Sequence, residues 1–360
     1  KMHNYINYLC IYYIIMVLLG AFCIRKGTKY KFFVYLYYNI SALLFFYFLY
    51  YWNTSFSGVW DNDRQFYFGL FLSWLVFISI MGIYVLIELI VRLLCIPFRM
   101  KKEHKIPSRR RFISLIGMGI ASIPFMGMLY GMFKGKYDFR VIKYTLFFDN
   151  LPEIFDGYRI IHISDIHSGS FDNHEKVQYG IDMINAQEGD AIFFTGDLVN
   201  NKATEMNEWI NHFKQLKAKD GIYSVLGNHD YGDYVQWNTP EEKEKNLEDL
   251  KKIHHNIGFY LLNNESVYIS RNGYRLAVIG VENWGRDFIK RGDLDEAIKG
   301  VPENDFKILL SHDPTYFEYK VIDYPVYIPL TLSGHTHGMQ FGIEIPGFIK
   351  WSPASWKYKY

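Results

Sequence analysis

Residues able to bind metal ions recur at five places in the second half of the sequence, each directly after a short apolar segment. In chain order these five motifs are Ser164-Asp165-Ile166-His167, Gly196-Asp197-Leu198-Val199-Asn200, Gly227-Asn228-His229-Asp230, Ser311-His312-Asp313-Pro314 and Gly334-His335-Thr336-His337-Gly338. Imidazole nitrogens and carboxylate or amide oxygens suit first-row divalent ions. No cysteine follows residue 137, so a metal centre in this half must use nitrogen and oxygen ligands.

The number of these side chains indicates more than one metal ion. Besides His229, we count two Asp, four His and one Asn as ligands. A single zinc ion takes only three or four protein ligands. Seven donors therefore favour two ions, about 3.5–4 Å apart, that share a bridging carboxylate. Such a pair clamps the attacking and leaving oxygens of a phosphoryl displacement.

The motifs follow short β-branched or aromatic stretches that we predict to be buried strands. These strands are Tyr158–Ile163, Ala191–Thr195, Ile222–Leu226, Lys307–Leu310 and Leu330–Leu332. Apolar residues at helical spacing over Met206–Leu216, and Pro240 followed by two glutamates, predict helices between them. The alternation indicates an α/β layered fold, in which ligands bind at the carboxyl ends of the strands. The other histidines of the helices are expected to be solvated, namely His174, His212, His254 and His255.

Together the motifs resemble the calcineurin-like metallophosphoesterase superfamily, and Ser164–Gly169 and Thr195–Asn200 look most like its bacterial membrane-associated, phosphodiesterase-like branch. The resemblance covers about residues 157–340 and implies a β-sandwich flanked by helices. It also implies the ligands of two metal ions. For the first ion they are Asp165, His167, Asp197 and His337, and for the second Asp197, Asn228, His312 and His335, with Asp197 as the bridge.

The resemblance further implies a mechanism. Two divalent ions, Mn²⁺, Fe²⁺ or Zn²⁺, would lower the pKa of a bridging water so that hydroxide attacks phosphorus. His229, beside a ligand, is expected to protonate the departing alkoxide. Asp230 either orients His229 or stabilises its turn, and both alternatives stay open. Related Ser/Thr phosphatases carry Asp at the position of Asn200, which can hydrogen-bond but cannot stabilise an imidazolium by charge.

Four windows without any charged residue predict membrane-spanning helices in the first half of the sequence. They are Asn4–Ile24, Phe32–Trp52, Gln65–Ile87 and Phe112–Phe133. Each has 21 to 23 residues, close to the ~20 needed to cross the hydrocarbon core. The sequence therefore predicts a four-helix transmembrane anchor, 1–136, and a metallophosphoesterase domain, 137–360, and excludes a purely soluble enzyme.

The charges of the loops predict on which side of the membrane the domain lies. Seven Lys and Arg residues lie from Arg99 to Arg111, just before the fourth window, and four separate the first and second windows, whereas the second loop has only one basic residue, Arg64. Cationic loops stay in the cytoplasm, so we expect the domain outside it. Four basic residues after the fourth window weaken this bias without reversing it. The segment Ser108–Ile113, which contains Arg109 and Arg110, also resembles a twin-arginine export signal.

These features favour a cell-membrane phosphoesterase whose substrate is a phosphodiester, or less readily a phosphomonoester, with a lipid or envelope phosphate as the hypothesis. One alternative is a UDP-sugar-lipid pyrophosphatase of the same superfamily, which would need a cytoplasmic domain. Another is a non-catalytic metal-binding membrane scaffold, against which the intact ligand set argues. The 39 basic and 37 acidic residues are too evenly balanced to predict a nucleic-acid partner. The family normally has further strands after its last motif, whereas 23 residues follow His337 here, which raises the hypothesis of a fragment.

Overall fold

The computed structural model describes residues 2–28, 30–54, 62–94, 107–286, 288–337, 343–345 and 349–351. By their internal packing the residues divide into two units, Lys1–Phe139 and Arg140–Tyr360. The loops 55–61 and 95–106, which carry much of the charge behind the predicted topology, lie outside the described residues.

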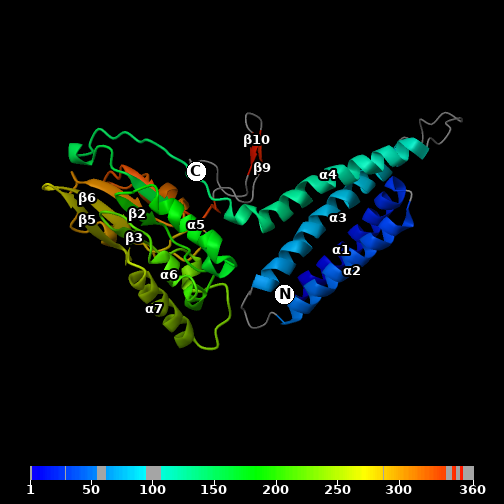
Figure 1. Cartoon of the computed structure of the whole chain (residues 1–360), viewed down its shortest axis with the longest axis horizontal. Coiled ribbons are helices and arrows are strands. Elements are labelled where there is room, and N and C mark those ends of the chain that lie inside the picture. Colours follow the sequence, from blue (N-terminus) through cyan, green and yellow to red (C-terminus); the bar gives the residue numbers. More distant parts are fainter. Residues whose placement is uncertain are drawn as a thin grey trace. The chain divides into compact units, whose positions relative to one another are not determined.

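The first unit consists of four long helices (Figure 1). They are α1 (Met2–Gly27), α2 (Lys31–Thr54), α3 (Asn62–Leu94) and α4 (Pro107–Phe133). All four are long and apolar enough to cross a membrane, which confirms the four predicted helices. Each is apolar around most of its circumference, as expected of a helix surrounded by lipid or by other apolar helices. Helix α1 packs against the other three.

Aromatic side chains fill the interior of this bundle. The Tyr13 ring of α1 stacks on Phe45 of α2 with 4.7 Å between centroids. The Tyr13 hydroxyl donates to Ser41 O at 2.8 Å, and Trp74 Nε1 of α3 donates to Ser41 Oγ at 3.0 Å. A polar group left unpaired in hydrocarbon costs several kcal/mol, so these bonds stabilise the contact between α1, α2 and α3.

The second unit contains two four-stranded sheets. The first sheet has the order β1 (Ile160–Ile163), β2 (Ala191–Phe194), β3 (Ile222–Ser224), β4 (Phe259–Leu261), with all neighbours parallel. The second has the order β5 (Glu265–Arg271), β6 (Tyr274–Gly280), β7 (Phe306–Leu310), β8 (Leu330–Leu332). Strand β5 runs antiparallel to β6, and β6, β7 and β8 are parallel. A separate antiparallel pair joins β9 (Ile343–Ile345) and β10 (Ile349–Trp351).

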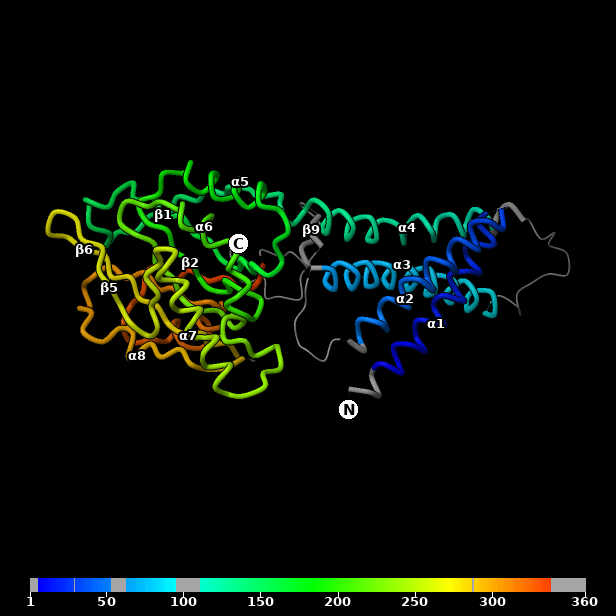
Figure 2. Tube along the Cα trace, turned by 60° about the horizontal axis from the view of Figure 1, so that its bottom comes forward, coloured from blue at the N-terminus to red at the C-terminus, as the bar shows by residue number. Residues whose placement is uncertain are grey.

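The two sheets form a sandwich around a shared core. Alternate residues of each strand point inward, among them Phe193 and Tyr223 from the first sheet and Val278 and Ile308 from the second. Helices cover the outer faces. In Figure 2 the green α5 and α6 lie beside the first sheet and the orange α8 beside the second. This arrangement confirms the predicted sandwich flanked by helices.

All five predicted strands are present, but β4, β5, β6, β9 and β10 were not predicted. The β5–β6 hairpin turns at Asn272-Gly273, where both residues have positive φ, 48° and 84°. Asn-Gly is the preferred sequence for a two-residue turn of this kind. This dipeptide was therefore a signal of the hairpin that the strand prediction did not use.

The helices of the second unit agree only partly with prediction. They are α5 (His174–Asn185), α6 (Ile210–Phe213), α7 (Pro240–Asn256) and α8 (Leu294–Ala297). The helix expected over Met206–Leu216 is wrong in length, because a 3-10 turn, Ala203–Met206, and the short α6 replace it. Helix α7 follows the prediction, with Thr239 as N-cap and Pro240 in the first turn.

The prediction that His254 is solvated is wrong. Its side chain is fully buried on the inner face of α7, with Nδ1 3.0 Å from Ser224 Oγ. The ring lies 6.0 Å from that of Phe194, which points outward from β2. A histidine in a polar helix was mistaken for a surface residue because two of the three buried residues of α7, Asn246 and His254, are themselves polar.

Candidate metal centre

The carboxyl ends of β1 and β2 lead into the first two motifs, and hydrogen bonds join the two turns. Asp165 N donates to Gly196 O and His167 N donates to Asp197 O, each at 3.0 Å. Because β1 and β2 are parallel neighbours, both turns leave the sheet at the same edge. The pairing therefore brings Asp165, His167 and Asp197 together.

Strands β7 and β8 deliver the last two motifs in the same way. Gly334 N donates to His312 O at 2.9 Å. His335 N donates to Asp165 Oδ2 at 2.9 Å, which links the last turn of the second sheet to the first turn of the first sheet. The candidate site therefore lies where the carboxyl ends of both sheets meet.

Five of the predicted ligands share a backbone conformation that residues other than glycine rarely adopt. Their φ angles are positive: 53° at Asp165, 46° at His167, 59° at Asp197, 69° at His335 and 50° at His337. The left-handed region costs a residue with a Cβ roughly 1–2 kcal/mol. Strain of this kind concentrates at functional sites, where the surrounding bonds hold the backbone in place.

Two glycines give Asp197 the space that its turn needs. Gly196 has a φ of 96°, which glycine adopts without steric cost. A Cβ on Gly227 would lie 2.5 Å from Asp197 N and still closer to its carboxylate. A Cβ on Gly196 would clash with the main chain of Gly227, so neither position accepts a larger residue without displacing the turns around Asp197.

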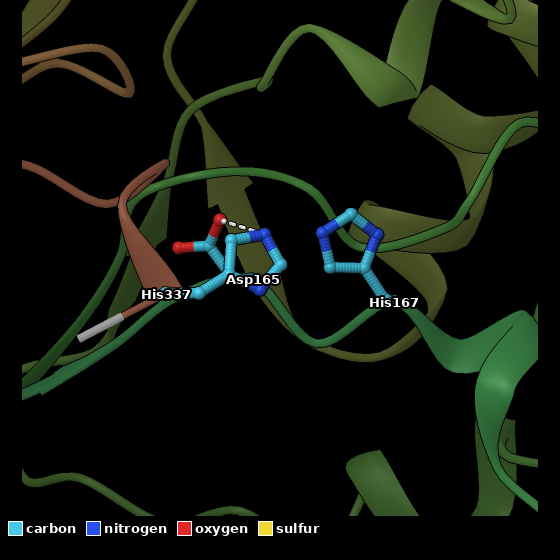
Figure 3. Close-up of side chains that lie close together, drawn as sticks. All are labelled: Asp165, His167 and His337. Atoms are coloured by element: carbon cyan, nitrogen blue, oxygen red, sulfur yellow. Dashed lines mark ion pairs between the residues drawn. The ribbon is translucent and has the colours of Figure 1, made fainter. Parts of the chain in front are cut away.

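Asp165, His167 and His337 form a first cluster, with ligand atoms within 4.8 Å of one another (Figure 3). His337 Nε2 lies 3.4 Å from Asp165 Oδ1. His167 Nδ1 lies 3.1 Å from Asn200 Oδ1, which leaves Nε2 facing the cluster. Burial lowers the pKa of His167 to about 4, so its imidazole is neutral at pH 7, the form that binds metal ions.

Asp197, His312 and His335 form a second cluster of the same size. His312 is completely buried, and its Nδ1 lies 2.7 Å from Thr195 O. A carbonyl only accepts, so Nδ1 carries the proton and Nε2 faces the cluster. That Nε2 lies 3.0 Å from Asn228 Oδ1 and 3.2 Å from His335 Nδ1.

The Asp197 carboxylate lies between the two clusters. Its Oδ1 accepts from His229 N at 2.9 Å. Its Oδ2 lies 3.5 Å from His167 Nε2 and 3.2 Å from His312 Nε2. One oxygen of Asp197 thus faces a predicted ligand of each ion.

The charges of this carboxylate and of His312 stabilise each other. Burial disfavours the charge of Asp197, but His312 outweighs it and holds the pKa of the carboxyl well below its usual range. Burial also opposes the charge of His312, and there Asp197 outweighs it and raises the pKa to about 10. A divalent ion would bind here in exchange for the proton of His312.

His229 and Asn200 are arranged differently from expectation. His229 Nδ1 lies 2.8 Å from the main-chain oxygen of Asn200, so Nε2 is left to face the cluster formed with His167 and Asp197. The Asn200 side chain contacts His167 instead. Asn200 therefore orients His229 through its main-chain oxygen and His167 through its side-chain oxygen. The bond that holds His229 does not depend on the side chain of Asn200.

Asp230 ties together the backbone of two turns. Its carboxylate accepts from Asp197 N, Leu198 N and Gly227 N at 2.9, 2.8 and 2.8 Å. Burial raises the pKa of Asp230 to about 7. Its described contacts correspond to the turn-stabilising alternative, since they hold the main chain on both sides of Asp197.

Two family models match this chain. The calcineurin-like phosphoesterase model matches residues 158–339, and the transmembrane-domain model of such phosphoesterases matches residues 3–136. The chain belongs to the calcineurin-like phosphoesterases. It is a membrane-associated metallophosphoesterase, from a family whose members typically bind divalent metal ions.

Several relatives resemble this phosphoesterase. An uncharacterised metallophosphoesterase of Bacillus subtilis, YkuE, is 30% identical over 67% of this chain and 81% of its own length. A transmembrane protein with a metallophosphoesterase domain from Danio rerio is 26% identical over 61% of this chain, which spans half of that protein's length. The UDP-2,3-diacylglucosamine pyrophosphatase LpxG of Chlamydia muridarum is 28% identical over 58% of this chain and 73% of its own.

Two residues outside the five sequence motifs support the phosphoesterase site. The Tyr234 hydroxyl accepts from Asn228 Nδ2 at 2.8 Å, which turns Asn228 Oδ1 toward His312. The Glu205 carboxylate accepts from Asn200 N at 2.6 Å and from Lys202 N at 2.9 Å. The bond from Lys202 N to Glu205 is half of a capping box, but the N-cap residue is Lys202 and not the usual Ser or Thr, so the sequence carried no signal for Glu205.

Proposed function

We propose that this chain is a membrane-anchored phosphoesterase that uses two divalent ions to hydrolyse a phosphodiester or phosphomonoester bond, the diester being favoured. The position of Asp197 Oδ2, facing His167 on one side and His312 on the other, carries this proposal. A carboxylate oxygen shared between two clusters of ligands suits a pair of ions that act together in hydrolysis.

The residues fit such a pair of ions. His167 Nε2 is buried and has no hydrogen-bond partner among the described residues, a costly state that a metal ion would relieve. The first ion would be held by Asp165, His167, Asp197 and His337. The second would be held by Asp197, Asn228, His312 and His335. When bound, divalent ions would polarise the phosphoryl oxygens and lower the pKa of water.

His229 is proposed as the proton donor to the leaving oxygen. Its Nδ1–H donates to Asn200 O at 2.8 Å, which fixes the ring and leaves Nε2 to carry a transferable proton. Its main-chain N holds Asp197 Oδ1, so the donor and the bridging ligand are positioned by one turn. The Tyr234 ring packs against the His229 ring, with 4.5 Å between their centroids.

The assay that tests this proposal uses the full chain in detergent with an aryl phosphodiester and an aryl phosphomonoester. Turnover should require Mn²⁺, Fe²⁺ or Zn²⁺, stop with chelator and be lost in Asp197→Ala. Asp323→Ala, which removes an exposed carboxylate, is the matched control and should keep full activity. Absence of turnover with every metal would contradict the proposal and favour the non-catalytic scaffold.

We further propose that residues 1–136 anchor a catalytic domain, 137–360, outside the cytoplasm. The basic residues of the first and third loops support this orientation. A substrate at the membrane surface, such as a lipid or envelope phosphate, would then be within reach of the site. We expect activity from a reporter that is fused to the C-terminus and functions only outside the cytoplasm. An inactive reporter would show that the domain lies in the cytoplasm instead.

The similarity to the LpxG pyrophosphatase supports a second candidate, hydrolysis of a UDP-sugar lipid. Both candidates can use the same ligands, because each reaction displaces an oxygen from phosphorus. A cytoplasmic reporter signal together with turnover of UDP-2,3-diacylglucosamine would favour this candidate. An extracytoplasmic signal without such turnover would favour the first.

A further inference from the structure

A pair of histidines lies on the second unit outside the candidate metal centre. His174 is the first residue of α5 and His212 belongs to α6, a helix that packs beside α5 (Figure 1). His174 Nδ1 and His212 Nε2 are 3.0 Å apart. Two nitrogens bound to one zinc ion, each at about 2.0–2.1 Å, lie about 3–3.4 Å from each other, so the observed separation is already that of two ligands.

A chain of hydrogen bonds determines which nitrogen of His212 carries the proton. The Asp182 carboxylate only accepts, so Gln178 must direct its Nε2 toward it, at 2.9 Å. Gln178 Oε1 then faces His212 Nδ1 at 2.8 Å and accepts its proton. The lone pair of His212 is therefore on Nε2, directed at His174. Metal-binding histidines are commonly oriented by such a bond from the other ring nitrogen.

Trp209 holds both rings in place. Its ring centroid lies 4.5 Å from that of His174 and 5.8 Å from that of His212, and its side chain is buried. Rings packed in this way lose little further freedom when they bind an ion, so the site is preorganised. Burial also lowers the pKa of His212, which keeps its imidazole neutral at pH 7.

The pair opens onto a surface hollow with a favourable charge for a cation. The hollow has a volume of about 420 Å³, and its described lining includes the carboxylates of Glu175 and Asp182 but no lysine or arginine. Glu175 and Asp182 contribute negative charge to the lining, and solvent reaches the coordination positions that the two histidines leave open. Two imidazole nitrogens completed by water suit Zn²⁺, Ni²⁺ or Cu²⁺.

We propose that His174 and His212 form a separate binding site for a divalent transition-metal ion such as Zn²⁺. On binding, the proton between the rings moves to His174 Nε2, and the lone pairs of His174 Nδ1 and His212 Nε2 both face the ion. No net proton is released. The ion links α5 to α6 and stabilises their contact.

The test counts Zn²⁺ ions bound per full-length chain after equilibrium dialysis over a range of free Zn²⁺ concentrations. Wild type should bind one more ion than either His174→Gln or His212→Gln, and Zn²⁺ should raise the melting temperature of wild type more than that of either variant. His255→Gln removes an exposed histidine of α7 and should bind as wild type does. Phosphoester turnover should be the same in all four proteins.

Equal zinc stoichiometry in wild type and both variants would overturn the proposal. Loss in only one of the two variants would also overturn it, because the site requires both nitrogens. The difference between variants does not depend on whether the candidate metal centre is catalytic, since its residues are unchanged throughout.

Discussion

At the scale of single residues, Asn200 holds two histidines through two different oxygen atoms. Its main-chain oxygen holds His229, and its side-chain oxygen holds His167. Substitution of the side chain therefore affects only one of the two histidines. This separation allows metal binding and proton donation to be tested independently.

We predict that Asn200→Ala weakens metal binding while leaving the chemical step nearly unchanged. The variant removes the acceptor of His167 Nδ1, and loss of such an orienting bond typically lowers metal affinity about 10–100-fold. Because the bond to His229 comes from the main chain, kcat at saturating Mn²⁺ should stay within a few-fold of wild type. Activity measured against free Mn²⁺ concentration separates the two effects.

Two variants serve as controls for this prediction. Asn200→Asp keeps an acceptor at the same place and should restore metal affinity, whereas Asn256→Ala, at an exposed position, should have no effect. A large fall in kcat with unchanged metal affinity in Asn200→Ala would contradict the assignment of the two oxygens.

At the scale of elements, His254 makes the packing of α7 on the first sheet dependent on pH. Burial lowers the pKa of His254 to about 3, against about 6.5 in an unfolded chain. Between these values the unfolded state binds more protons than the folded state, so the free energy of unfolding falls as pH decreases below about 6.5. The contribution is fully present above that pH.

We predict that His254→Leu reduces this loss of stability in acid. A single group can contribute at most about 1.4 kcal/mol per pH unit, so from pH 7.5 to 5.5 wild type should lose about 1 kcal/mol more than the variant. In the variant, the Ser224 hydroxyl loses His254 as a partner but can still donate to Tyr260 O, which lies 3.4 Å from Ser224 Oγ. Urea unfolding of both proteins at the two pH values measures the difference.

The exposed His255 provides the control for this experiment, since His255→Gln should keep the wild-type dependence on pH. Identical pH dependence in His254→Leu and wild type would show that His254 is not buried in its neutral form.

The sequence predicted the elements that carry the motifs better than the rest of the fold. Buried parallel strands such as β2 are short apolar runs, and the turn residues after them are distinctive. Strand β5 has a single buried residue, Ile269, among exposed and half-buried ones and carries no motif, so it was missed. The roles of Asn200 and Glu205 depend on hydrogen bonds to main-chain atoms, which residue types at a given spacing do not specify.

At the scale of the whole second unit, the candidate metal centre connects the two sheets. Asp165, His167 and Asp197 follow strands of the first sheet, and His312 and His335 follow strands of the second. An ion that binds only the folded arrangement stabilises it by about 2.7 kcal/mol at one hundred times its dissociation constant.

We therefore predict that chelation destabilises this unit and that metal restores it. The melting temperature of the full chain should fall by several degrees with chelator and recover with excess Mn²⁺. Asp197→Ala should show a much smaller change, because it removes the shared ligand. A chelator effect of the same size in Asp197→Ala would place the stabilising ions elsewhere.

At the scale of the whole chain, one pair of substitutions distinguishes two explanations for a domain outside the cytoplasm, namely the charge of the loop and a twin-arginine signal. Arg109→Lys with Arg110→Lys keeps both positive charges of the loop, so orientation by charge alone should be unaffected. A twin-arginine signal depends on the arginines themselves. We predict that the double variant keeps its C-terminal domain in the cytoplasm, where external protease cannot reach it in spheroplasts. The converse exchange, Lys101→Arg with Lys102→Arg, is the control and should leave the domain exposed to protease. If protease cleaves the Arg109→Lys, Arg110→Lys variant as readily as wild type, the charge of the loop and not the arginine pair determines the orientation.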